Sequence, residues 1–256
     1  MTGPLRGAFL EDLTWLEAKA WFDRDPVIVL GIGAIAKEHG HHLPLNTDFR
    51  IARALLEGVG RALPVLLAPI LSFGYYPAFR HYPGSQHLEA ETFIAVLREL
   101  LGGFIGQGAR RLAIVNTGVS TEGPIRIAVR DLLQAHGIRV AVADIATLGR
   151  KADPLFQQKL GGHADEHETS LMLAIAPDSV RQDLARPNYG NALGSPKTVF
   201  YQPTIFSGEP TSGLDYSEQG ARGDPTLATA EKGRQALDAM IDDLVSGLVA
   251  LHPDLG

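Results

Sequence analysis

Cysteine is absent from this 256-residue chain. Its absence excludes disulfide bonds, thiolate metal ligands and a cysteine nucleophile. Any bound metal must therefore use histidine, carboxylate, carbonyl or water ligands. Such ligands suit Zn²⁺, Mn²⁺ or Fe²⁺ better than Cu⁺ or an iron–sulfur cluster.

The chain also lacks an excess of positive charge. Lysine and arginine together number 23 against 29 acidic residues, for a net charge of −6. A nucleic-acid partner needs a basic face, so we expect no nucleic acid as the main partner. A small-molecule substrate, including an anionic one, remains compatible with this charge.

Long hydrophobic runs are missing as well. None approaches the roughly 20 residues that span a bilayer. Residues 1–22 lack the basic-then-apolar layout of a signal peptide. We therefore expect a cytoplasmic protein with no membrane partner. With 45% hydrophobic residues, the chain has the composition and length of one large domain, which we place at residues 1–256.

What is present is an alternation of compact apolar runs with segments of helical periodicity. Buried strands are predicted at 26–33, 65–71, 111–116 and 139–145, and helices at 13–22, 47–63, 89–101, 124–136, 168–176 and 226–251. This order predicts an α/β fold: a single-domain three-layer sandwich with a central, mostly parallel sheet flanked by helices. Residues 203–222 are predicted to form a long surface loop or arm. Ligands bind beyond the carboxyl ends of such strands, so the loops after Gly33 and Asn116 should carry the chemistry.

The first of these loops is rich in histidine. Residues 38–48 read Glu-His-Gly-His-His-Leu-Pro-Leu-Asn-Thr-Asp. Imidazoles and a carboxylate in a short loop can converge on one cation, since both are natural zinc donors. The alternative is a polar loop with ordinary hydrogen bonds, which is the simpler interpretation of His41 or His42 taken singly.

A second cluster follows two glycines. Residues 161–170 include His163 and, five residues later, Glu168 at the start of a predicted helix. The pair could act as a base and its orienting group. The acids could equally complement the helix dipole while the histidines are exposed.

Both segments resemble signatures of the creatininase (creatinine amidohydrolase) family. Residues 38–48 are similar to its carboxylate, His-Gly-x-His and Leu-Pro-Leu-x-x-Asp signature. Residues 163–172 are similar to its histidine followed by Glu-Thr-Ser. Weaker similarities lie at 13–15, 81–84, 109–112, 223–225 and 228–233. The resemblance covers nearly the whole chain and implies the creatininase-like version of the predicted fold.

The resemblance also implies an activity. Family members hydrolyse cyclic or linear amides and related small C–N substrates, commonly with Zn²⁺, Mn²⁺ or Fe²⁺. By this mapping His39 and Asp48 are metal ligands, with Asp48 as the bridge if two ions bind. His163 takes the place of the catalytic histidine, and Glu168 supports it. Alternatives are cleavage of a C–C bond in a cyclic keto sugar, trimming of a peptide, or ligand binding without catalysis.

Two departures from the family pattern affect the metal site. The first glutamate usually lies two residues before the metal histidine, where this chain has Lys37; Glu38 is adjacent to His39 instead. Glu38 reaches the ion if the loop bulges, and otherwise points away.

The second departure follows Asn116. The family usually has Asn-Gly-His-x-Glu or Asn there, whereas this chain reads Asn-Thr-Gly-Val-Ser-Thr-Glu over 116–122. Glu122 is either a displaced ligand or an ordinary acid in the first turn of a helix. We therefore expect one or two divalent ions per chain. A replacement ligand could come from His41, His42, His81 or His163.

The family resemblance further implies a homo-oligomer, in typical cases a hexamer. The predicted arm at 203–222 is a candidate interface segment. The residues that bind substrate are not identified by the sequence, and the natural substrate is expected to differ from creatinine because the metal site differs.

Overall fold

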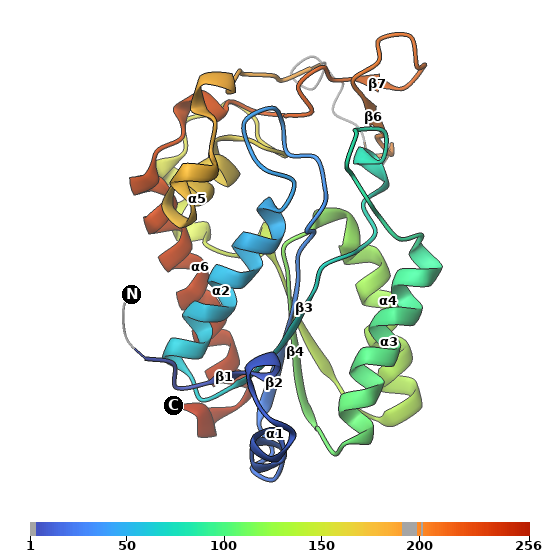
Figure 1. Cartoon of the computed structure of the whole chain (residues 1–256), viewed down its shortest axis with the longest axis vertical. Helices are drawn as coiled ribbons and strands as arrows, with labels where there is room; N and C mark the ends of the chain where they lie inside the picture. Colours follow the sequence, from blue (N-terminus) through green and yellow to red (C-terminus); the bar gives the residue numbers. More distant parts are fainter. Residues whose placement is uncertain (1–3, 191–198, 201) are drawn as a thin grey trace.

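The computed structural model describes residues 4–190, 199–200 and 202–256. Within these residues, five parallel strands form a central sheet in the order β1–β3–β2–β4–β5 (Figure 1). They are β1 (Ala8–Phe9), β2 (Val27–Ile32), β3 (Leu66–Leu71), β4 (Arg111–Asn116) and β5 (Val140–Asp144). The predicted sheet and its four longer strands are confirmed. The additional strand, β1, has two residues, too few for a periodic pattern.

Six α-helices surround the sheet in the described part of the chain. They are α1 (Trp15–Phe22), α2 (Thr47–Ala62), α3 (Ala90–Gly106), α4 (Glu122–His136), α5 (Glu166–Ile175) and α6 (Ala230–Leu251). All six predicted helices are present, with starts that differ by up to four residues. Within the described residues, no helix combines the length and hydrophobicity needed to cross a membrane.

The sheet is buried on both faces, which explains its continuous apolar runs. Val27 and Val29 of β2 belong to a core shared with α2, α5 and α6. Ile28 and Leu30 face the opposite way, into a core shared with α3 and α4. Figure 1 shows these two helix layers on opposite sides of the sheet. The three-layer prediction is therefore confirmed.

The end of β2 and the start of α2 approach each other closely, next to the predicted site residue Asp48. A Cβ atom on Gly33 would lie 2.6 Å from the carbonyl oxygen of Asp48, so only glycine allows α2 to start so near the strand end. The hydroxyl of Thr117, beyond the end of β4, hydrogen-bonds to the carbonyl oxygens of Ile32 at 3.0 Å and Asp48 at 3.1 Å. These contacts hold Asp48 at the carboxyl edge of the sheet.

The predicted arm at 203–222 contains a second, two-stranded sheet. Strands β6 (Phe206–Ser207) and β7 (Asp215–Tyr216) pair in parallel. The carbonyl oxygen of Ser217 accepts a hydrogen bond from the Tyr82 hydroxyl at 2.6 Å. A Cβ atom on Gly220, which has φ +70°, would collide with the carboxylate of Glu38. This segment therefore packs directly against one of the predicted site residues.

Candidate active site

The loop between β2 and α2 turns its charged side chains inward. Lys37, Glu38 and His39 are all buried, and His39 is completely shielded from solvent. The Lys37 amide donates to the carbonyl oxygen of Leu45 at 3.0 Å. Gly40, directly after His39, has φ +72°, a left-handed conformation that glycine adopts without strain. The turn at this glycine keeps three consecutive polar side chains near the start of α2.

His39 is held so that one ring nitrogen faces Asp48. Its Nδ1 atom lies 2.9 Å from the carbonyl oxygen of Lys37, which can only accept, so Nδ1 carries the proton of the neutral ring. Its Nε2 atom lies 2.9 Å from Asp48 Oδ1. A nitrogen lone pair and a carboxylate oxygen at this separation repel one another unless a proton or metal cation lies with them. The pair therefore fits a divalent ion, for which both atoms are ordinary ligands.

The structure adds Lys37 to the site. Its Nζ atom lies 2.7 Å from Asp48 Oδ2, in an ion pair that is nearly inaccessible to solvent. Burial alone would lower the pKa of Lys37, but the charges of Asp48, Glu168 and Glu38 outweigh it and raise the pKa. Burial likewise opposes ionisation of Asp48, yet the Lys37 ammonium lowers its pKa. The ammonium and the carboxylate are thus both charged at neutral pH. The sequence signal for Lys37 was a cation standing in the place of the family's glutamate.

Glu38 and His163 form a second buried pair. His163 Nε2 lies 2.9 Å from the Glu38 carbonyl oxygen and 3.0 Å from Glu38 Oε2. Both oxygens accept, so Nε2 carries the proton and Nδ1 keeps its lone pair. The ring of Phe79 stacks on that of His163, with centroids 3.9 Å apart. The Glu38 carboxylate also accepts from the Gly40 amide, and these interactions lower its pKa despite burial.

Glu168 lies in the first turn of α5, which begins where Asp165 caps it. Asp165 Oδ1 accepts from the amides of His167 and Glu168 at 2.9 and 3.0 Å. Glu168 Oε2 accepts from the Ala164 amide at 2.6 Å and lies 3.8 Å from His163 Nδ1. Burial raises the pKa of Glu168 to about 7, and the charge of Asp48 adds to the rise. A nearby cation would relieve this cost.

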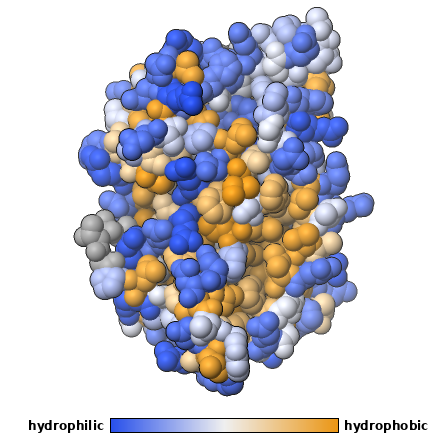
Figure 2. Space-filling view, viewed as in Figure 1, coloured by the Kyte–Doolittle hydropathy of each residue, from blue (hydrophilic) through white to orange (hydrophobic). Residues whose placement is uncertain are grey.

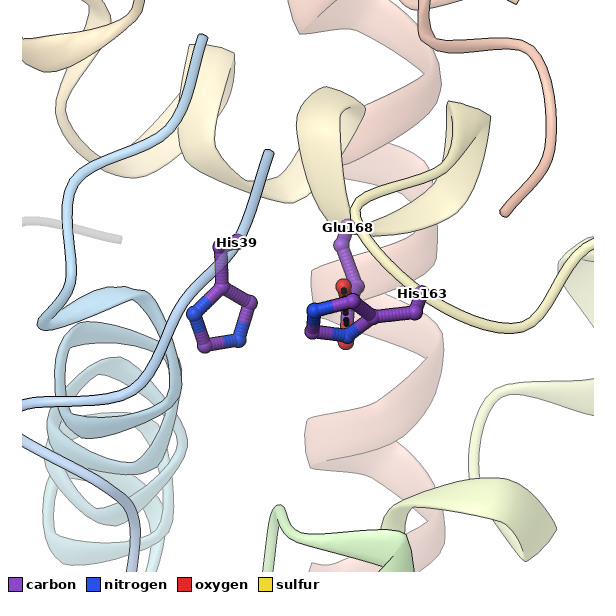
Figure 3. Close-up of side chains that lie close together, drawn as sticks. All are labelled: His39, His163 and Glu168. Carbon is purple, nitrogen blue, oxygen red and sulfur yellow. Dashed lines mark ion pairs between the residues drawn. The ribbon is translucent and has the colours of Figure 1, made fainter. Parts of the chain in front are cut away.

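These side chains converge on one point. The ligand atoms of His39, His163 and Glu168 all lie within 4.8 Å of one another, a spacing at which they could share a metal ion. Figure 3 shows the two imidazole rings side by side, with Glu168 against His163; the ring centroids of His39 and His163 are 4.8 Å apart. The chemistry of the donors, imidazole and carboxylate, is that of a Zn²⁺ or Mn²⁺ centre.

Glu122 lies elsewhere. It starts α4, is partly exposed and forms an ion pair with Arg126 one turn later. Ahead of it, Asn116 and Thr121 close the loop after β4, since Thr121 Oγ1 donates to Asn116 Oδ1 at 2.6 Å. A ligand role for Glu122 stays a prediction without a supporting contact.

The remaining histidines of the motifs also differ in placement. His41 and His81 are exposed. His42 is buried, with Nε2 2.8 Å from the hydroxyl of Thr169. That contact accounts for the threonine of the Glu-Thr-Ser motif, because it ties α5 to the histidine loop.

Two surface clefts flank the buried cluster. One, of about 580 Å³, is lined by Glu168 together with Asp165, Gly161 and Lys159. The other, of about 500 Å³, is lined by Glu38, His41 and Glu209. Both volumes lie in the range of small-molecule sites. Glu168 has 17% of its side chain exposed, so the larger cleft gives access to the more open edge of the cluster.

Comparisons with known proteins identify relatives of nearly the whole chain. The model of the family "Creatininase: Creatinine amidohydrolase" matches residues 11–248. The chain is 33% identical to the mycofactocin precursor peptide peptidase of Mycobacterium tuberculosis, over 89% of this chain and 86% of the relative. It is 27% identical to the creatinine amidohydrolase of Pseudomonas putida, over 95% and 96% of the two chains. A solved structure, "Creatininase Mn", superposes with a TM-score of 0.78 at 25% identity, covering 96% and 99%.

The three-layer fold and the buried imidazole–carboxylate cluster are those of an α/β protein with a candidate active site at the carboxyl edge of its parallel sheet. The chain belongs to the creatininase family, whose members are hydrolases.

Proposed function

We propose that this protein is a divalent-metal hydrolase that cleaves the C–N bond of a small cyclic or linear amide. The observation that carries the proposal is the pair formed by His39 and Asp48. The lone pair of His39 Nε2 and the Oδ1 oxygen of Asp48 lie 2.9 Å apart, as two ligands of one cation would. Glu168, whose ionisation burial disfavours, is the third donor in this proposal.

A divalent ion at this position would make a bound water acidic and polarise the carbonyl oxygen of the substrate. His163 Nδ1 has a lone pair and accepts the proton that the attacking water loses. Its other nitrogen donates to Glu38, which holds the ring in the required tautomer and orientation. His163 then returns the proton to the leaving nitrogen. In this proposal Glu38 orients the base and is not itself a ligand.

The substrate enters through the cleft beside Glu168, of about 580 Å³. This size suits a cyclic amide or the end of a peptide. Peptide trimming is the second candidate, favoured by the 33% identity to a precursor peptide peptidase. Both reactions require the same attack on an amide carbon, so the buried residues would serve either one.

Metal content and hydrolysis test this proposal together. Protein purified without chelators is analysed by elemental mass spectrometry, then assayed against cyclic amides and short peptides. We expect a bound divalent ion and amide hydrolysis in the wild type, and loss of both in His39→Ala. His41→Ala is the matched control, because this exposed histidine lies on the same loop. Full metal occupancy in His39→Ala would contradict the proposal. No ion even after reconstitution would favour a ligand-binding protein without catalysis.

We also propose a homo-oligomer, as the family resemblance implies. Among the residues that the structure describes, strand β3 pairs with β2 alone beyond Phe9 and Leu67, so one edge of the sheet has no partner strand there. Phe73, just after β3, is exposed. Figure 2 shows hydrophobic surface gathered over this part of the molecule. Light scattering tests the assembly, and a monomeric mass would remove it.

A further inference from the structure

The two oxygens of the Asp48 carboxylate have different partners. Oδ1 lies 2.9 Å from His39 Nε2, and Oδ2 lies 2.7 Å from Lys37 Nζ. A carboxylate can bridge two cations in this way. Here the cation next to Oδ2 is the ammonium group of Lys37.

The Lys37 side chain is held in place by specific contacts. The residue is 5% exposed, although lysine is rarely buried unless it is paired. Its ammonium lies 5.4 Å from the ring centroid of Phe79 and 5.9 Å from that of Tyr76, two rings that face a cation favourably. Phe79 in turn stacks on His163. The aromatic pair and Asp48 thus hold the ammonium inside the cluster.

A second metal ion on the same oxygen would conflict with this ammonium. A metal–carboxylate bond is about 2.0–2.2 Å long, so an ion that bound Asp48 Oδ2 on the side of Lys37 would lie too close to Nζ, which is 2.7 Å from that oxygen. The loop after β4 offers no substitute ligand nearby, because Asn116 and Thr121 bond to each other and Glu122 pairs with Arg126. Both the volume and the positive charge of the ammonium therefore disfavour a second metal ion at this position.

We propose that the Lys37 ammonium is a built-in cation that replaces a second metal ion on Asp48, so that the centre binds a single divalent ion per chain. The inference rests on the proposed metal-dependent function and specifies its stoichiometry. Lys37 is a positioning residue: it neutralises one side of the Asp48 carboxylate and leaves Oδ1 for the ion. The charge that a second ion would supply is present before any metal binds.

The wild type alone gives the first test. Apo protein is titrated with Mn²⁺ by calorimetry, and the loaded protein is examined by electron paramagnetic resonance. We expect one ion per chain and the spectrum of an isolated Mn²⁺ ion. Two ions with a spin-coupled spectrum would overturn the Lys37 proposal and leave the proposed function intact. Absence of any bound ion would overturn both.

Two variants distinguish two effects of Lys37: its positive charge, and the absence of a metal-ligating atom at this position. Lys37→Met removes the charge at similar length, and we expect the single ion to bind about tenfold more tightly or better because repulsion is lost. Lys37→Glu frees Asp48 Oδ2 and adds a carboxylate, and we expect two ions per chain. Unchanged affinity in Lys37→Met would overturn the proposal, and this variant decides if Lys37→Glu does not fold.

Lys232→Met is the matched control. Lys232 is also largely buried and pairs with a buried carboxylate, that of Glu166; its Nζ contacts Glu166, Gln157 and Leu227, and none of these is a proposed metal donor. Its loss should lower stability without changing the number or affinity of bound ions. A change in ion affinity as large as that in Lys37→Met would mean that any lost lysine pair acts this way, and would refute a specific role for Lys37.

Discussion

The loops that follow β2 and β4 leave neighbouring strands at the same edge of the sheet, yet their side chains make different kinds of contact. The loop after β2 sends Lys37, Glu38 and His39 into the interior, where they meet Asp48 and the second histidine motif. The loop after β4 closes on itself through Asn116 and Thr121. One loop supplies charged groups and the other supplies support.

The difference bears on the proposed metal site. Thr117 braces the backbone of Asp48 at 3.1 Å, so the β4 loop still affects the site without a ligand of its own. Lys37 places a positive charge beside the Asp48 side chain. In the proposed metal site, the β4 loop and Lys37 would therefore contribute a hydrogen bond and a fixed charge instead of ligands.

The largest effect is expected from Asp48→Asn, which removes a charge from the buried cluster formed with the loop after β2. Losing this ligand should weaken ion binding by more than about 100-fold, beyond the usual effect of an outer-shell change. It also leaves the Lys37 ammonium buried without its counter-ion, at a cost of about 3 kcal/mol in unfolding free energy. Calorimetric titration and urea unfolding measure the two effects. Asp131→Asn, which removes a carboxylate that pairs with Arg98 on the exposed side of α4, is the control and should retain the ion; an Asp48→Asn protein with wild-type affinity would contradict the assignment.

A pH dependence is expected from His42 in the β2 loop. Burial lowers the pKa of His42 to about 4, below its ordinary value of 6.5. The unfolded chain therefore takes up a proton first as the pH falls, and the folded state loses stability below pH 6.5. Between pH 7 and pH 5 this amounts to about 2 kcal/mol. Urea unfolding of wild type and His42→Gln at both pH values checks it: the variant should lose less stability on acidification, and an equal loss would exclude His42 as the source.

A smaller effect is expected from Thr117→Val, which probes the supporting loop. The substitution keeps the shape but removes the hydroxyl that bonds to the carbonyls of Ile32 and Asp48. We expect a loss of about 1 kcal/mol in stability, the usual worth of such hydrogen bonds, and weaker ion binding because the start of α2 is less firmly held. Thr147→Val, whose hydroxyl bonds to Asp144 in an exposed turn, is the control. Unchanged ion affinity would mean that the β4 loop does not support the centre.

The smallest effect is expected from Glu122→Gln. The carboxylate pairs with Arg126 on the surface of α4, and exposed pairs contribute little. Metal content by elemental mass spectrometry should match that of the wild type. Loss of the ion in this variant would mean that Glu122 is a metal ligand, and that both loops supply ligands.

Much of the fold was predictable because its strands are buried on both faces. Residues 111–116 were predicted and observed with identical bounds, since a compact apolar run between arginines and a polar loop has few alternatives. Strand β1 was missed because two residues have no pattern. Strands β6 and β7 were missed for the same reason, within a segment predicted as a loop.

The candidate site was predictable to the extent that motifs encode it. His39, Asp48, His163 and Glu168 were all selected from two short segments, and the structure brings them together across more than 120 residues of sequence. The sequence left Glu38 open, and its carboxylate points at His163. It did not place Lys37 in the cluster, because the effect of a lysine depends on what surrounds its ammonium.

By itself the sequence determined the donor chemistry, the family and the layered sheet, because these follow from residue types and from periodicities along the chain. The tertiary structure decided which way each charged group points. Lys37 and Glu38 are adjacent in sequence, yet one meets Asp48 on α2 and the other meets His163 before α5. Electrostatic interactions in a buried site depend on distances of a few ångströms between distant segments, and only the packed fold sets those distances.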